Sequence, residues 1–391
     1  MTAQRSDAVP VEDLAAASTG SRRVAIVGPD ASSLVRLRGG LIVAITAQGH
    51  RVLALAPDLE AGTNAALAAL GAETAGYPLH AGGVQPLAER RSVTALAAVF
   101  GRWRPDVVLG FGLKPMLLAA IAGRRCGATS IVPLVSTLAE LAHGRRARPG
   151  PALGWMMRSA FKAAHAIVFH NADDAARLRA TGLLPAGTPV HIVPGRGVDL
   201  AHFAHAPLPP LAPGLVFTMI ARLETGKGVI EFCEAARRVR ARAPATRFVL
   251  AGTASTSRDR VTPEVLARYG DCVEWVGWHD DVRPLLAQTH VFVLPSHAEG
   301  MPPALQEALA VGRPVITCDV PGCRETVDER VNGVLVAKQD AVALAGAMES
   351  FLKRPDLIPW MSRASRLKAE RRFDANTINA GWLAILGLRP A

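Results

Sequence analysis

Short runs of apolar residues recur along the chain, each closed by glycine, proline or a polar loop and separated by longer mixed segments. Runs of this kind are typical of buried parallel strands. Their alternation with helical segments predicts a doubly wound α/β fold. The strands expected on this basis are 22–28, 51–57, 106–110, 129–135, 165–169, 190–193, 215–221, 247–252, 273–277, 291–294 and 314–318.

The clearest strand–loop–helix–strand unit lies within residues 290–318. Its first apolar run, 291–294, stops at a proline and is followed by the small polar loop 296–300. Pro302 then stands where a first helical turn tolerates proline, and the pattern predicts a helix over 304–310. The loop therefore lies at the carboxyl end of a strand, where open α/β sheets bind their ligands.

Two carboxylates belong to this unit, Glu299 in the loop and Glu307 in the helix. A carboxylate in the early turns of a helix can accept hydrogen bonds from both vicinal hydroxyls of a ribose. Backbone N–H groups of Gly300, Met301 and Ala304, at a helix N-terminus, can meet phosphate or sugar oxygens. The same spacing also suits two solvated glutamates on an ordinary surface helix, and the spacing alone does not decide between the two.

A second loop with charged side chains follows the expected strand 215–221 and contains Arg222, Gly226 and Lys227. A guanidinium binds a diphosphate in bidentate fashion, and an ammonium meets it as a point charge. Taken alone this is a weak motif, because such residues are also common in solvated loops.

The run P-S-x-x-E-G-x-P-x-x-x-x-E-A-x-A-x-G-x-P-V-I-T, residues 295–317, resembles the C-terminal donor-site signature of GT-B glycosyltransferases, specifically the retaining family 4 enzymes. Segments 321–327 and 332–336 continue the resemblance, and R-x-x-x-x-K-G at 222–228 is similar to the diphosphate site of that family. The resemblance implies an α/β fold of the GT-B type, in which two doubly wound Rossmann-like domains face a central cleft.

With this fold the chain divides into five segments. Residues 1–20 are expected to form a disordered tail, and 21–200 to form an N-terminal, acceptor-side Rossmann-like domain. A linker, 201–214, leads to the C-terminal nucleotide-sugar-binding domain, 215–372. Residues 373–391 form a C-terminal helix that crosses back to the N-terminal domain. The length supports two domains, because single cores rarely grow past about 250–300 residues.

The resemblance implies a retaining, metal-independent hexosyltransferase. Its donor would be a nucleotide diphosphate sugar, a UDP-sugar, and its acceptor a polyprenyl-diphosphate-linked glycan or a polysaccharide. No cofactor is expected, since the nucleotide sugar is a co-substrate, and the chain has no D-x-D motif of a cation-dependent GT-A site. A UDP-sugar 2-epimerase of GT-B fold and a non-catalytic donor-binding partner in a glycan-assembly complex remain alternatives.

The resemblance also implies roles for individual residues. Arg222 and Lys227 would stabilise the charge on the leaving diphosphate, and Glu299 would touch the transferred sugar. Glu307 would hold the ribose, and His279 or its neighbour Trp278 would lie beside the base. The catalytic candidates are Arg222, Lys227 and Glu299, and the donor-binding candidates are Gly226, Gly300, Met301, Pro302, Ala304, Glu307 and His279.

Three residues of the first domain are candidates for the acceptor side. Gly39 and Gly40 fall inside an apparent helix, where each costs about 1 kcal/mol relative to alanine. Their presence suggests a helix that starts later or a backbone held close to another group, and simple tolerance of the two glycines within the helix is the alternative. Lys114, at the carboxyl end of a strand, could meet an anionic acceptor or be a solvated surface lysine. A histidine that many family 4 relatives carry in this domain is replaced by Ser136–Leu138.

The formal net charge of +11 is concentrated in the first half of the chain, where residues 1–205 hold 21 Lys and Arg against 13 Asp and Glu. Anionic lipid or a phosphorylated substrate could meet this charge. Nucleic acid is not expected, because its binding surfaces usually interleave basic with aromatic residues, and aromatics make up only 5% of the chain.

The segment 143–165 has basic residues beside an amphipathic stretch with Trp155 and Phe161, which suits shallow insertion into an anionic membrane surface. A core helix with an inward Met/Phe face is the alternative. No run of eighteen apolar residues is present, and no signal peptide is expected. The prediction is a cytoplasmic protein, peripheral on the inner face of the cell membrane.

Overall fold

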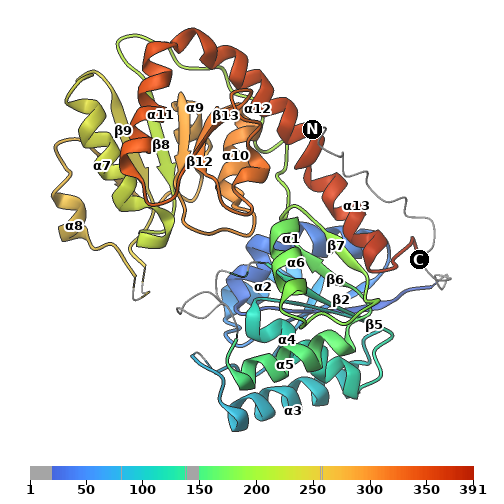
Figure 1. Ribbon diagram of the computed structural model, residues 1–391. Coiled ribbons are helices and arrows are strands. Elements are labelled where there is room, and N and C mark those ends of the chain that lie inside the picture. The colour runs from blue at the N-terminus through green and yellow to red at the C-terminus, as the bar shows by residue number, and fades with distance from the viewer. Residues whose placement is uncertain (1–19, 81, 137, 139–148, 256, 258) are drawn as a thin grey trace.

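The computed structural model describes residues 20–391 except 81, 137, 139–148, 256 and 258. Within this part of the chain, two parallel β-sheets lie in two lobes, each covered by helices (Figure 1). The expectation of an α/β fold with two doubly wound sheets is confirmed.

In the first lobe, the described residues form a seven-stranded parallel sheet of order β3-β2-β1-β4-β5-β6-β7. Its strands are β1 Arg23–Val27, β2 Arg51–Ala56, β3 Ala72–Gly76, β4 Val107–Phe111, β5 Ser130–Val135, β6 Ile167–Phe169 and β7 Val190–Ile192. The sequence predicted six of these strands. It missed the edge strand β3, of which a single residue is buried, so that the segment has no strong apolar pattern.

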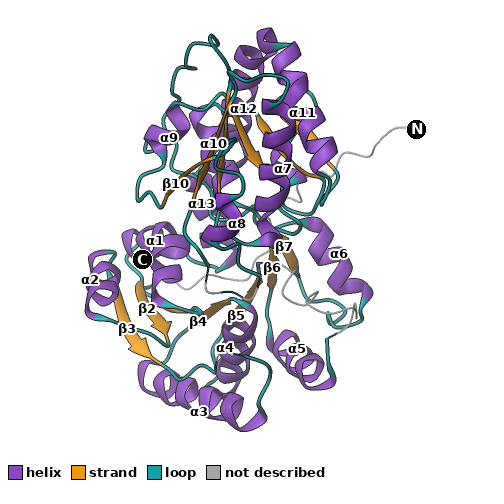
Figure 2. Ribbon diagram, turned by 90° about the vertical axis from the view of Figure 1, so that its left-hand side faces the viewer, coloured by secondary structure: helices purple, strands orange, loops and turns teal. Residues whose placement is uncertain are grey.

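The helices of the first lobe cover both faces of this sheet (Figure 2). They are α1 Ala31–Ala47, α2 Ala61–Ala69, α3 Pro86–Trp103, α4 Leu113–Arg125, α5 Pro151–Ala163 and α6 Ala172–Ala180. Buried side chains of α1 and α2 pack with one face, and those of α3, α4, α5 and α6 pack with the other.

In the second lobe, the described residues form a six-stranded parallel sheet of order β10-β9-β8-β11-β12-β13. Its strands are β8 Val216–Ile220, β9 Arg247–Ala251, β10 Glu274–Gly277, β11 Val291–Leu294, β12 Val315–Cys318 and β13 Gly333–Val336. Its helices are α7 Val229–Arg240, α8 Pro263–Ala267, α9 Arg283–Ala287, α10 Pro303–Val311, α11 Ala341–Lys353 and α12 Ile358–Arg372. Helix α7 packs on α11, and α10 packs on α9 and α12.

The last helix, α13 Ala375–Ile385, follows α12 and runs back along the first lobe, where it packs on α1 (Figure 1). Its Trp382 is 1% exposed and belongs to the apolar core of that lobe. Where α12 passes into α13, Val198 donates a hydrogen bond to the Phe373 carbonyl at 2.7 Å and accepts one from Ala375 N–H at 3.1 Å. The two chain segments that connect the lobes, 196–199 and 373–375, are thus tied side by side, and we call them the hinge.

Helix α1 runs unbroken through Gly39 and Gly40, so the expectation of a helix that starts later is wrong. The other expectation, a closely held backbone, fits the packing. An added Cβ at Gly39 would lie 3.2 Å from Leu70, and one at Gly40 would lie 3.3 Å from Asn379 of α13. The two glycines therefore let neighbouring segments approach α1.

Each sheet has one position where the strand order reverses, between β1 and β4 in the first lobe and between β8 and β11 in the second. The loops at the carboxyl ends of such neighbouring strands leave a crevice that binds ligands in open α/β sheets. In the second lobe these are the loops after β8 and after β11, which carry the charged residues singled out from the sequence.

Candidate functional site

The loops after β8 and β11 meet at Gly228. This residue has a φ of 77°, and an added Cβ would lie 2.1 Å from the carbonyl oxygen of Pro295. Only glycine combines this backbone conformation with such a close approach. The preceding residue, Lys227, is thereby brought beside the loop that carries Glu299.

Lys227 and Glu299 form an ion pair in which Nζ lies 2.5 Å from Oε1. The Ser296 hydroxyl donates to the same carboxylate oxygen at 2.9 Å. The side chains are only 22% and 12% exposed, so water screens this pair less than it would a surface pair. The structure therefore brings together two residues that the sequence assigned to the diphosphate and to the sugar, and the pair neutralises both charges.

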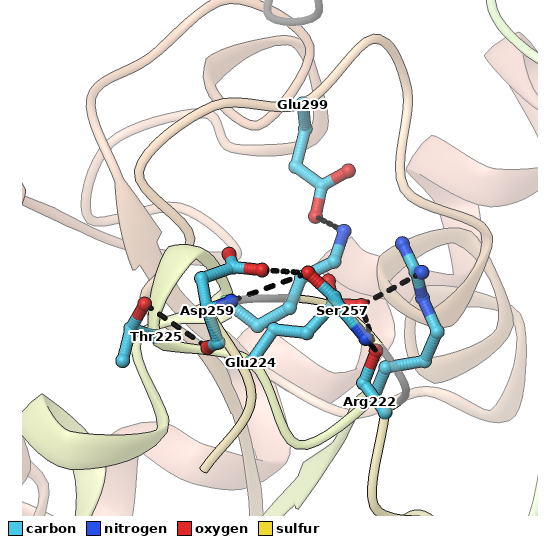
Figure 3. A network of polar contacts seen from close by, with 8 residues as sticks. Arg222, Glu224, Thr225, Ser257, Asp259 and Glu299 are labelled. Atoms are coloured by element: carbon cyan, nitrogen blue, oxygen red, sulfur yellow. Dashed lines mark hydrogen bonds and ion pairs between the residues drawn. The ribbon is translucent and has the colours of Figure 1, made fainter. Parts of the chain in front are cut away.

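Arg222 lies in the same loop, with its guanidinium 2.8 Å from Glu224 and its side chain 64% exposed (Figure 3). Glu224 also accepts a hydrogen bond from Ser255 at 2.7 Å. The carbonyl of Gly226 accepts a hydrogen bond from the His297 N–H at 2.9 Å, a second link between the loops after β8 and β11. Arg222 is thus accessible to a ligand, and Gly226 takes part in holding the two loops together.

The start of α10 carries the remaining backbone candidates. Pro302 is the N-cap residue, Ala304 lies in the first turn, and Met301 is buried. The N-terminus of a helix favours anions, because its first N–H groups have no partner within the helix. Asn171, the N-cap residue of α6 in the first lobe, donates from Nδ2 to the Gly300 carbonyl at 3.0 Å. Sequence reasoning did not single out this contact between the lobes.

Glu307 of α10 pairs with Arg196 of the hinge, with Nη2 2.6 Å from Oε1. Burial raises the pKa of Glu307, and the charge of Arg196 opposes this shift. No role for Arg196 follows from the sequence alone, because its partner lies 111 residues away along the chain.

His279 follows β10, whereas the charged candidates follow β8 and β11. It lines a cavity of about 250 Å³ together with Thr218, Arg247 and Glu274, and none of the other predicted site residues lines that cavity. The neighbouring Trp278 is exposed and donates from Nε1 to Asp280 at 2.8 Å.

Lys114 lies at the start of α4 and is 13% exposed, so its interpretation as a solvated surface lysine is wrong. Its Nζ lies 2.6 Å from Glu89 of α3 and donates to the carbonyls of His80 and Gly83 at 2.9 and 3.1 Å. The second carboxylate oxygen of Glu89 is buried and has no hydrogen-bond partner among the described residues. Lys114 thus holds the loop after β3. The other two acceptor-side candidates, Gly39 and Gly40, lie elsewhere, on α1.

His170, at the carboxyl end of β6, is buried, and its Nδ1 lies 2.8 Å from the Val193 carbonyl oxygen and 3.2 Å from the Gly195 backbone nitrogen. Burial and the nearby charge of Arg38 lower the pKa of His170 to about 3. An unfolded histidine takes up its proton near pH 6.5, so below that pH the unfolded chain binds more protons and the free energy of unfolding falls.

We expect the unfolding free energy of His170→Gln to fall less at acid pH than that of the wild type. Between pH 7.5 and 5.5 the wild type should lose about 1.4 kcal/mol more unfolding free energy than the variant, as measured by urea unfolding at both pH values. Equal losses in the two proteins would show that His170 takes up its proton in the folded state.

No helix among the described residues is long and apolar enough to cross a membrane. The described residues also contain no group of three or more His, Cys, Asp or Glu side chains placed to hold a metal ion. The basic residues of the expected membrane-binding segment, Arg145, Arg146 and Arg148, lie outside the described residues.

Two family models match the chain, one on each lobe. Residues 36–196 match the glycosyl transferase 4-like domain, and residues 214–354 match the glycosyl transferases group 1. The second match contains both loops of the candidate donor site.

Curated relatives include a putative colanic acid biosynthesis glycosyltransferase, WcaL, of Escherichia coli. It is 34% identical over 200 residues, which cover 49% of this chain and 49% of WcaL. An N,N'-diacetylbacillosaminyl-diphospho-undecaprenol alpha-1,3-N-acetylgalactosaminyltransferase of Campylobacter jejuni is 26% identical over 59% of this chain and 62% of its own. The chain thus spans about half the length of the first curated relatives that it matches.

Among solved structures, Anabaena HepE in complex with UDP-glucose superimposes with a TM-score of 0.72, at 17% identity, over 92% of this chain and 98% of HepE. This similarity extends over both lobes and concerns the fold. Together with the two family matches, it shows that the chain belongs to the group 1, family 4-like glycosyltransferases of GT-B fold.

Proposed function

We propose that the protein is a retaining, metal-independent glycosyltransferase. It takes a sugar from a nucleotide diphosphate donor, a UDP-sugar, and transfers it to a polyprenyl-diphosphate-linked glycan or a polysaccharide. In this proposal residues 21–200 form the acceptor-side domain, 215–372 bind the donor, 201–214 link the two, and 373–391 return to the first domain. The observation that carries the proposal is the Lys227–Glu299 pair at the switch point of the second sheet.

The pair suits a sugar diphosphate because Lys227 can bind the diphosphate and Glu299 can bind the sugar. The diphosphate replaces Glu299 as the partner of Lys227 and also binds the exposed Arg222, so that both cations face its negative charge. Glu299, released from its lysine, accepts hydrogen bonds from hydroxyls of the transferred sugar. Glu307 holds the ribose in place of Arg196, and the first N–H groups of α10 face the phosphates.

In the transfer step the acceptor hydroxyl attacks the anomeric carbon from the side of the leaving group, so the configuration is retained. The bond from that carbon to the diphosphate oxygen breaks, the new glycosidic bond forms, and the hydroxyl proton passes to the departing phosphate. Negative charge grows on the diphosphate as this bond breaks. Lys227 and Arg222 stabilise that charge from fixed positions, which is how oxyanion sites lower barriers.

A groove on the first lobe supports the proposal that the acceptor is lipid-linked. It has a volume of about 350 Å³ and lies between α3, α4 and α5, with Val93, Leu118 and Met156 among its apolar lining residues. Trp155 at its side is 62% exposed, and Arg125 also lines it, so an apolar chain and an anionic headgroup would both find a partner. The Campylobacter relative is named for a diphospho-undecaprenol acceptor. We propose on this basis that the enzyme works as a peripheral protein at the inner, cytoplasmic face of the membrane.

A transfer assay tests the proposal. The protein is incubated with UDP-glucose, UDP-galactose or their N-acetylated forms and with a polyprenyl-diphosphate-linked sugar, with and without EDTA. We expect UDP release and a longer glycolipid by mass spectrometry, an α-glycosidic bond by NMR, and the same rate with EDTA. An epimerised donor without glycolipid, or donor binding without reaction, would overturn the proposal.

A further inference from the structure

A cavity of about 190 Å³ opens at the hinge, between α1, the connecting segment 196–199 and α13. At about 30 Å³ per water molecule this is room for about six waters. Its lining is basic and includes Arg36, Arg38, Arg196, Gly197, Asn379 and Trp382. None of the residues proposed to bind the donor diphosphate lines it.

Arg38 is the feature of this cavity that needs explanation. It is 3% exposed, yet within the described part of the chain its guanidinium has no carboxylate at ion-pair distance, and its Nε is buried without a hydrogen-bond partner. The guanidinium lies 4.9 Å from the ring centre of Phe111 and 5.9 Å from that of Trp382. Aromatic faces attract a cation, but they leave its charge uncompensated. Burial and the charge of Arg196 lower the pKa of Arg38 to about 10, so it stays charged at neutral pH.

The other charged groups around the cavity leave an excess of positive charge. Arg196 donates to the Arg36 carbonyl at 3.0 Å and to Glu307 at 2.6 Å, and its Nε is buried without a partner among the described residues. Asp199 also lines the cavity, but its Oδ1 accepts two backbone N–H groups at 2.9 Å. Buried charges are expensive unless they are paired.

We propose that this cavity is a binding site for an oxyanion of the phosphate class, held between Arg38 of α1 and Arg196 of the hinge. Guanidinium groups bind tetrahedral oxyanions through parallel, charge-assisted hydrogen bonds, and both arginines line the cavity. A bound oxyanion links α1 to the segment between the lobes. It also competes with Glu307 for Arg196 and so makes the Glu307 carboxylate available, a consequence that rests on the proposed function.

Titration calorimetry with inorganic phosphate tests the site. We expect the wild type and Lys227→Ala to bind phosphate with similar affinity, and Arg38→Met to bind it at least tenfold more weakly. Arg91→Met is the matched control, since it removes an exposed arginine of the same lobe and should bind like the wild type. Loss of binding in Lys227→Ala but not in Arg38→Met would place the phosphate at the loop after β8 and overturn the proposal, as would absence of binding by the wild type.

Geranyl phosphate, which has the same oxyanion on an apolar chain, distinguishes a free anion from a lipid headgroup. Tighter binding than that of phosphate, lost in Arg38→Met, assigns the site to a headgroup, and weaker binding assigns it to a free anion. Should Arg38→Met fail to fold, a crystal structure of the wild type grown with phosphate decides, with density expected between Arg38 and Arg196 and not elsewhere. None of these measurements uses sugar transfer, so their failure is distinct from failure of the proposed function.

Discussion

Replacing Lys227 with alanine should lower kcat by about 10²- to 10³-fold, or about 2.7–4 kcal/mol of transition-state stabilisation. The reason is that the ammonium faces charge that develops on the leaving diphosphate, so its contribution is larger in the transition state than in the bound donor. Binding of the donor should weaken less than kcat falls. Steady-state kinetics of UDP release, with calorimetry of UDP binding, measures both effects.

Lys353→Ala is a suitable control, because it removes an exposed lysine at the end of α11 in the same lobe and should keep the wild-type kcat. Lys227→Ala also leaves Glu299 without its ion-pair partner, so circular dichroism and a melting curve must show that the variant is folded. A folded variant with the turnover of the wild type would mean that the diphosphate binds elsewhere.

The sequence predicted the unit from β11 to β12 closely because its signals are local. Apolar runs mark both strands, a proline tolerated in the first turn marks the start of α10, and Gly312 ends the helix in a left-handed conformation. Even the place of the site follows, because the residues after a parallel strand lie at its carboxyl edge.

The partners of the charged residues did not follow from the sequence. Lys227 and Glu299 are 72 residues apart, and Arg196 of the hinge and Glu307 of α10 are 111 apart. A motif specifies what each loop contains, but contacts between loops depend on how two sheets and two lobes pack. The close approach of Gly228 to Pro295, which creates the first pair, is visible only in three dimensions. His279 shows the same limit, since its position in the sequence does not reveal that its side chain lines a cavity with Thr218, Arg247 and Glu274.

Replacing Glu307 with alanine should raise the KM for the donor by about 10- to 150-fold and change kcat little. Hydrogen bonds to a charged group contribute about 1.5–3 kcal/mol, and each 1.4 kcal/mol is a factor of ten in affinity. The ribose does not change during the transfer, so Glu307 stabilises the bound donor and the transition state equally, which is the signature of uniform binding. The two variants should therefore separate in steady-state kinetics, Lys227→Ala mainly in kcat and Glu307→Ala mainly in KM.

The Arg196 side chain makes a second comparison possible. If Arg196 competes with the ribose for Glu307, Arg196→Ala should lower the donor KM in the wild-type background and have no effect in Glu307→Ala, and this non-additivity measures the coupling of the pair. Glu264→Ala, at an exposed position of α8, serves as the control for loss of one carboxylate. A donor KM that stays the same in Glu307→Ala would show that the ribose is held by another group, because a buried carboxylate that binds it cannot be removed without loss of affinity.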